Sequence, residues 1–226
     1  MMQFNTFINE AADSKQNLHM THANEDLYER GDKGAQAAID FITDFAKNLG
    51  KGTTKLTVKW DGAPAVFCGT DPADGKFFVG TKSVFAKTPK LYKTIADIDA
   101  NESGGKADKL KTCLEFLPSV GISKNVVLQG DMLWGPGDLK YETIDGKRYV
   151  VAHPNTIAYA WLSDSPAGKE VANAQMGIVW HTSYSGRGDL SSYGSSFGVD
   201  VSKLKKKRAV WQEDAYFKGA NIAFTD

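Results

Sequence analysis

Four consecutive residues, Lys59-Trp60-Asp61-Gly62, place a primary amine next to a carboxylate and a glycine. The lysine ends a strand-like alternating run, and the Gly-Ala-Pro sequence that follows predicts a tight bend. Covalent nucleotidyl transfer uses this arrangement, because a desolvated lysine near cationic groups is partly neutral and attacks the α-phosphate of a nucleotide. Lys59 is therefore a candidate nucleophile. The alternative interpretation is a strand-end lysine followed by an ordinary Asp-Gly turn.

Further polar motifs follow the tetrad along the chain. Gly80-Thr81-Lys82-Ser83 comes after a predicted strand, LQGDML (128–133) and GIV (177–179) lie within two others, and a basic cluster covers Lys203 to Arg208. In this order the motifs resemble those of the covalent nucleotidyltransferase superfamily, which includes ATP-dependent DNA ligases, RNA ligases and mRNA capping enzymes. The resemblance covers roughly residues 56–207. The stretch KWDGAPAVFCGTDPADGKFFVGTKS, with AHPNTIAY and GIVWHTSY, also resembles a group of tailed-phage proteins with a ligase-like domain.

This resemblance implies a nucleotide site, with ATP and Mg²⁺ as cofactors and a DNA or RNA end as the second substrate. In this site Lys59 is implied as the nucleophile that forms lysyl-AMP, next to Asp61 and Gly62 of the tetrad. Lys82 and Ser83 are implied at the ribose and phosphate, and Asp131 at the ribose hydroxyl and the metal. Tyr149 is implied to stack on the base, and Lys203 and Lys205 to contact the α-phosphate. Two positions differ from the family pattern. Met176 stands where the family has a metal-coordinating acid, and Asp131 replaces a glutamate.

A second hypothesis is a degenerate ligase fold that serves a phage as a binding or structural module without turnover. The missing acid at Met176 favours it, as does the net charge of zero, because a ligase gains affinity for nucleic acid from many basic contacts. Simpler interpretations also exist for single residues. Asp131 suits a cap or a turn, Lys203 to Lys207 suits a solvated basic face, and His181 suits a hydrogen-bonded core histidine.

The elements that would position these residues are mostly strands. The pattern predicts one amphipathic helix over 34–49, a second over 107–117, a hairpin turn at DPADG (71–75) and a flexible connection at 189–198. The six predicted strands are LTVKW, PAVFCG, KFFVGT, NVVLQGDML, RYVVAH and MGIVWHTSY. Few helices separate the strands, so we expect largely antiparallel pairing and an α+β class. The resemblance implies two antiparallel sheets around a nucleotide cleft, within a single domain that has a helical N-terminal cover (1–50) and a β-rich core (51–226).

Composition limits the alternatives. With 27 basic and 27 acidic residues and 42% hydrophobic residues, the chain is expected to be globular, without a strongly charged coat or tail. Cys68 and Cys113 are expected to be free and reduced, and His19 and His22 lack the partners of a zinc site. The chain has no signal-like segment and no apolar run near 18 residues, which predicts a cytoplasmic protein, in the host cytoplasm if phage-encoded, without a membrane partner. About twenty residues follow Lys205, too few for the OB domain of ligases, so we expect end joining to require a partner protein or a further C-terminal region.

Overall fold

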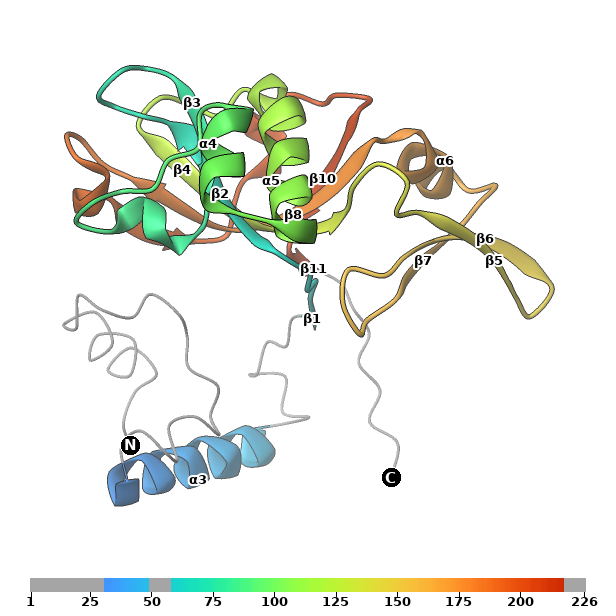
Figure 1. Ribbon diagram of the computed structural model, residues 1–226. Coiled ribbons are helices and arrows are strands. Elements are labelled where there is room, and N and C mark those ends of the chain that lie inside the picture. Colours follow the sequence, from blue (N-terminus) through green and yellow to red (C-terminus); the bar gives the residue numbers. More distant parts are fainter. Residues whose placement is uncertain (1–30, 49–57, 218–226) are drawn as a thin grey trace. The chain divides into compact units, whose positions relative to one another are not determined.

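The computed structural model describes residues 31–48 and 58–217 of the chain (Figure 1). The chain divides into two compact units, Met1–Leu56 with Ile222–Asp226, and Thr57–Asn221. In the first unit the described element is α3 (Gly31–Asn48), which contains nearly all of the helix predicted over 34–49 and begins three residues earlier. His19 and His22 lie outside the described residues.

The second unit contains three sheets. The largest has six strands in the order β10-β8-β4-β2-β3, with β9 also paired to β8, and a smaller sheet has the order β5-β6-β7. A two-stranded ribbon joins β1 to β11. The strands are β1 (Val58–Lys59), β2 (Ala65–Thr70), β3 (Phe77–Gly80), β4 (Val126–Trp134), β5 (Lys140–Ile144), β6 (Lys147–Ala152), β7 (Tyr159–Leu162), β8 (Met176–Ser185), β9 (Gly194–Phe197), β10 (Val210–Asp214) and β11 (Tyr216–Phe217).

The α+β class predicted from the sequence is confirmed, and strand pairing is antiparallel except between β10 and β8, which run parallel. Each predicted strand coincides with an observed one. Of the first predicted strand, LTVKW, the structure describes only the last part. The DPADG hairpin turn is confirmed as well: the Gly75 amide donates to the Asp71 carbonyl at 2.8 Å, and Gly75 has a φ of 73°, which a glycine adopts without strain. The predicted connection at 189–198 contains the short helix η3 (Leu190–Ser192) and β9.

Two helices cover one face of the large sheet, as Figure 1 shows. They are α4 (Ile95–Asn101) and α5 (Gly104–Phe116), and α5 continues into the 3-10 turn η2 (Leu117–Val120). The helix predicted over 107–117 is thus confirmed. Leu110 and Cys113 of α5 pack with Met132, Ile178 and Trp180 in the largest apolar cluster of the unit. Alternate residues of β4 and β8, including Asp131, therefore point to the opposite face.

That opposite face carries two other apolar clusters. One contains Phe67, Phe78 and Tyr184, and the other joins the large sheet to the β5-β6-β7 sheet through tryptophans. Helix α6 (Pro166–Asn173) lies beside the smaller sheet (Figure 1). Among the described residues, no helix is long and apolar enough to cross a membrane.

Candidate functional site

The tetrad 59–62 passes from the β1-β11 ribbon into the large sheet. Lys59 is the cross-strand neighbour of Tyr216, and the Trp60 amide donates to the Ala215 carbonyl at 2.8 Å. The chain then bends, and the Ala63 amide donates to the Met132 carbonyl at 3.0 Å. These backbone hydrogen bonds hold the tetrad directly against β4, at the level of Asp131, the predicted site residue on that strand.

Gly62 is pressed closely against β4. A Cβ atom at this position would lie 2.5 Å from the Met132 carbonyl oxygen and 3.1 Å from the Asp131 Cβ. A separation of 2.5 Å is shorter than real Cβ contacts. The absence of a side chain therefore permits the close approach of the tetrad to this strand. Gly62 has a packing role that brings the lysine end of the tetrad towards Asp131.

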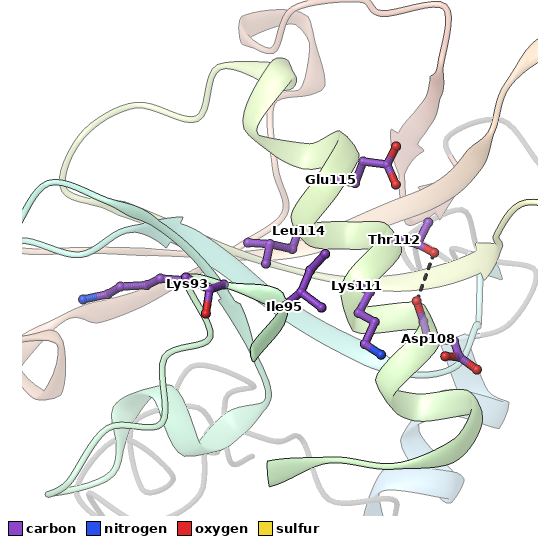
Figure 2. Close-up of a pocket in the computed structure, with 8 residues that line it drawn as sticks. Lys93, Ile95, Asp108, Lys111, Thr112, Leu114 and Glu115 are labelled. Carbon is purple, nitrogen blue, oxygen red and sulfur yellow. Dashed lines mark hydrogen bonds between the residues drawn. The ribbon is translucent and has the colours of Figure 1, made fainter. Parts of the chain in front are cut away.

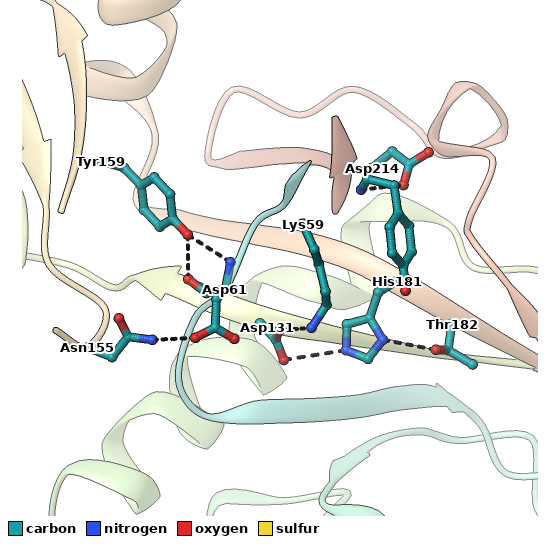
Figure 3. A network of polar contacts seen from close by, with 9 residues as sticks. Lys59, Asp61, Asp131, Asn155, Tyr159, His181, Thr182 and Asp214 are labelled. Atoms are coloured by element: carbon teal, nitrogen blue, oxygen red, sulfur yellow. Dashed lines mark hydrogen bonds and ion pairs between the residues drawn. The ribbon is translucent and has the colours of Figure 1, made fainter. Parts of the chain in front are cut away.

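Lys59 and Asp131 meet in the structure, although 72 residues separate them. The Lys59 Nζ atom lies 3.3 Å from Asp131 Oδ2 (Figure 3), and the side chains are 40% and 7% exposed respectively. A buried carboxylate is costly unless charged or polar partners compensate for its lost hydration. The half-exposed amine supplies that compensation from the solvent side.

His181 contacts the other oxygen of the same carboxylate. Its Nε2 atom lies 3.4 Å from Asp131 Oδ1, and its Nδ1 atom lies 2.9 Å from Thr182 Oγ1. Figure 3 shows the carboxylate joined by dashed lines to both the amine of Lys59 and the ring of His181. The three side chains form one connected network, which we call the Lys59-Asp131-His181 network.

Asp61, the acidic member of the tetrad, is engaged by residues of the β6-β7 region. The Asn155 side-chain amide donates to Asp61 Oδ2 at 2.8 Å, and the Tyr159 hydroxyl accepts from the Asp61 amide at 2.7 Å and donates to its carbonyl at 2.9 Å. Burial raises the pKa of Tyr159, which keeps this hydroxyl protonated and able to donate. Asp61 thus fixes the bend of the tetrad.

Trp60 lies within a cluster of aromatic rings. Its ring centroid is 4.6 Å from that of Tyr159, 5.9 Å from that of Trp161 and 5.8 Å from that of Trp211. Trp60 directly follows β1, and the other rings come from β7 and β10, so the cluster links the tetrad to two sheets. Aromatic packing of this kind contributes about 0.5–1.5 kcal/mol per pair beyond the buried area, and it makes the position of Lys59 rigid.

An exposed aromatic pair borders the network on its other side. Phe197 is 72% exposed, and its ring centroid lies 4.0 Å from that of Tyr216, the cross-strand neighbour of Lys59. Phe197 pairs with Thr182 in the β8-β9 ladder, and the Gly198 amide donates to the His181 carbonyl at 2.9 Å. The pair therefore offers a solvent-facing ring next to the network.

The structure brings some of the other predicted site residues to this region. Gly80, at the end of β3, pairs with Phe67, and Ala65 of the same β2 strand pairs with Asp131. Lys82 and Ser83 follow in the 3-10 turn η1 (Lys82–Phe85), so they leave the sheet at the end where the tetrad enters it. Lys82 is exposed, and Ser83 Oγ lies 3.1 Å from Thr81 Oγ1.

Three predicted residues lie elsewhere. Tyr149 of β6 alternates with Val150, which packs in the tryptophan cluster, so Tyr149 faces the other side of its sheet. Lys203 pairs with Asp200 at 3.2 Å. The Lys205 amide donates to the Val120 carbonyl at 2.8 Å, and its side chain lies beside the turn that follows α5, on the face of the large sheet opposite Asp131. The basic cluster is therefore not placed with Lys59.

The described residues provide few free ligands for a bound Mg²⁺ ion. Both oxygens of Asp131 already face a partner, and Met176 is fully buried in the apolar cluster beneath α5. Within residues 31–48 and 58–217 no group of three or more acidic, histidine or cysteine residues is arranged to hold a metal. These residues do not fit a metal bound by the protein alone.

A hollow of about 580 Å³ lies away from the predicted residues, beside α4 and α5 (Figure 2). Lys93, Ile95 and Lys111 line it together with the exposed side of α5. Lys111 pairs with Asp99 at 2.5 Å, and the Thr112 hydroxyl donates to the Asp108 carbonyl of its own helix at 3.0 Å. The polar groups are thus engaged locally and do not converge on a common point.

Sequence reasoning did not identify several residues of the site. His181 was interpreted as structural, and Asn155, Tyr159, Phe197 and Tyr216 were not singled out. Period-two alternation along β8 could have placed a polar His181 on the same face as Asp131. The contacts of Tyr159 and Phe197 depend on how separate sheets meet, for which the sequence carries no local signal.

The comparisons with known proteins return one match. No curated protein and no solved structure matches the chain. A family model described as a family of unknown function (DUF6267) matches residues 17–224, and this chain belongs to that family.

Proposed function

We propose that the protein is a nucleotidyltransferase that forms a covalent lysyl-nucleotide at Lys59, with ATP as the nucleotide and a DNA or RNA end as the acceptor. The observation that carries the proposal is the contact between Lys59 and the buried Asp131. Two motifs that suggested nucleotide chemistry from the sequence, 72 residues apart, share one site.

The reaction requires little from the protein besides position and charge. The half-exposed Lys59 amine gives a proton to solvent and attacks the α-phosphorus, a P–N bond forms, and the bond to the bridging oxygen breaks as pyrophosphate leaves with its electron pair. The carboxylate of Asp131 holds the amine in place beforehand. Lys82, at the same end of the sheet, supplies a positive charge for phosphate oxygens.

The exposed aromatic pair supports a planar ligand at this site. Stacking of a base on an aromatic ring contributes about 1–3 kcal/mol and tolerates different bases. Phe197 and Tyr216 supply such a surface beside Lys59, whereas Tyr149 does not. The proposal therefore assigns base stacking to a different part of the chain from the one that the family resemblance implies.

The test is incubation with ATP and Mg²⁺ followed by intact-mass measurement. We expect a gain of one AMP that resists base, as a phosphoramidate does, and its loss in Lys59→Arg, which keeps the charge. Lys93→Arg is the matched control, because Lys93 also pairs with a buried aspartate, Asp71, at 2.5 Å. We expect the Lys93 variant to form the adduct.

A specific observation favours the second candidate, a degenerate ligase fold that serves a phage as a binding or structural module without turnover. Met176 is fully buried among apolar residues, so the position that holds an acid in the resembling enzymes cannot present one here. In that case the wild-type mass would stay unchanged at millimolar ATP, and a change in the tryptophan fluorescence of the protein on addition of nucleotide would show binding without turnover. An adduct that persists in Lys59→Arg would instead assign the chemistry to another lysine.

A further inference from the structure

The antiparallel ladder between β4 and β8 is interrupted beside the candidate site. Gln129 pairs with Thr182, but the next residue, Gly130, pairs with Trp180, so His181 is an extra residue on β8 with no partner opposite it. Bulges of this kind re-aim a side chain and are over-represented next to active sites. The extra residue here is the one that contacts Asp131.

The sequence of β4 is adapted to this bulge. A Cβ atom on Gly130 would lie 2.5 Å from the Val179 carbonyl oxygen and 2.7 Å from a ring carbon of Trp180. Only glycine allows β8 to approach so closely at the irregularity. The glycine that precedes Asp131 therefore permits the bulge that aims His181 at Asp131.

His181 is held on both sides of its ring and at its backbone. Its side chain is 9% exposed, its Nδ1 atom contacts Thr182 Oγ1, and its carbonyl accepts from the Gly198 amide. With the proton on Nε2, the ring accepts at Nδ1 from the Thr182 hydroxyl, and its Nε2 side faces Asp131 Oδ1 at 3.4 Å. The carboxylate then has a fixed partner on one oxygen and the lysine amine on the other.

We propose that His181 is a positioning residue that fixes the orientation of the Asp131 carboxylate and, through it, the position of the Lys59 amine. The proposal rests on the proposed function for its effect on turnover. Its structural content, that His181 restrains the Lys59-Asp131 pair, is testable without nucleotide. The competing explanation is that His181 only fills the bulge, in which case an apolar side chain of similar size would serve as well.

The first experiment measures the reactivity of the Lys59 amine in the protein alone. A brief pulse of acetic anhydride followed by peptide mass analysis compares the labelling of Lys59 with that of exposed Lys140. Because pairing with Asp131 shields the amine from the reagent, His181→Leu and Asp131→Asn are expected to increase labelling of Lys59 several-fold. His181→Gln, which keeps a side-chain N–H, is expected to label like the wild type. Wild-type labelling in His181→Leu overturns the proposal.

The second experiment measures the rate of adduct formation against ATP concentration. His181→Leu is expected to lower the maximal rate by about 10- to 100-fold with little change in the half-saturating ATP concentration, and His181→Gln to recover most of it. A His181→Gln variant as slow as His181→Leu overturns the proposal, because shape rather than the N–H would then matter. If the wild type forms no adduct with any nucleotide, the proposed function fails, while the labelling experiment still decides the role of His181.

Two further variants complete the design. His153→Leu is the matched control, because His153 also contacts a carboxylate, Glu142 at 3.3 Å, but on the exposed β5-β6 hairpin. It is expected to leave labelling of Lys59 unchanged. If His181→Leu does not fold, Thr182→Val removes the partner of Nδ1 without altering the bulge, and increased labelling of Lys59 in that variant supports the proposal, whereas wild-type labelling overturns it.

Discussion

Replacement of Gly62 by alanine tests whether the close contact between the tetrad and β4 creates the site. The added Cβ would lie 2.5 Å from the Met132 carbonyl oxygen, 3.0 Å from Leu133 Cδ2 and 3.1 Å from Asp131 Cβ. The first of these atoms belongs to the backbone of a central strand and cannot move aside alone. The tetrad must therefore shift outwards, which separates the Lys59 amine from Asp131.

The expected loss of stability in Gly62→Ala has two contributions. Overpacking of a tightly filled position costs about 1–3 kcal/mol. The shift also weakens two backbone hydrogen bonds, from the Ala63 amide to the Met132 carbonyl and from the Met132 amide to the Pro64 carbonyl, at about 1 kcal/mol each. A total of about 3–5 kcal/mol lowers the midpoint of thermal unfolding by roughly 6–20 °C for a protein of this size.

The assay is thermal unfolding followed by circular dichroism, combined with acetylation of Lys59 in the folded protein. Gly105→Ala is the matched control, because no atom lies within 4 Å of a Cβ at that position in α5. Alanine there is expected to stabilise the helix by up to about 1 kcal/mol. The reasoning is refuted if Gly62→Ala unfolds at the same midpoint as the wild type and labelling of Lys59 is unchanged. The added methyl group would then fit between the tetrad and β4 without displacing either.

Two other predictions concern groups outside the tetrad. Burial raises the pKa of Tyr184 to about 12, so its contribution to stability is complete below the ordinary tyrosine pKa near 10 and is lost as the pH rises towards 12. Tyr184→Phe should therefore reduce the alkaline loss of stability in urea unfolding, and at neutral pH it should cost about 1 kcal/mol because the hydroxyl donates to Gln129 Oε1 at 2.7 Å. Lys205→Ala should leave the rate of adduct formation at the wild-type value in the intact-mass assay, because Lys205 packs on the face of the sheet opposite Asp131. A large loss of adduct in that variant would show that the basic cluster moves to the site.

Much of the fold could be predicted because its main strands are strongly patterned. The strand that contains Asp131 and the strand that contains His181 are long runs of apolar and β-branched residues, and Gly and Asp mark the hairpin before Phe77. Two of the strands that were missed, β5 and β9, lack this pattern. All residues of β5 are exposed, and Gly194-Ser195-Ser196 of β9 resemble a loop in composition, so pairing with a neighbouring strand rather than local preference determines their structure.

The missed helices did carry local signals. Thr94 and Asp97 form a capping box at the start of α4, and Ser165 caps α6, whose first residue is Pro166. Both helices are short, with 7 and 8 residues, so the apolar periodicity that reveals longer helices is weak. The caps were the stronger evidence in these two segments.

Only the part of the candidate site that consists of sequence motifs could be predicted from the sequence. Lys59 and Asp131 belong to recognisable motifs, and they meet. Lys205 belongs to the basic cluster, a less specific motif, and the connection that follows β9 carries it to the side of the sheet covered by α5. Which face a loop crosses to is decided by the packing of whole elements, and a motif of charged residues does not encode that choice.

The cost of burying Asp131 argues that the Lys59-Asp131-His181 network has a purpose beyond folding. A carboxylate that is 7% exposed on a central strand loses most of its hydration, and pairs of this kind are often no more stabilising than apolar residues of similar volume. The chain nevertheless places a lysine, a histidine and a strand bulge around that one side chain, with glycines at 62 and 130 that make the approach possible. Departures from the most stable local solution concentrate at functional sites, because there the arrangement of charges matters more than the stability it costs. These features support the proposal that the tetrad is part of a reactive site.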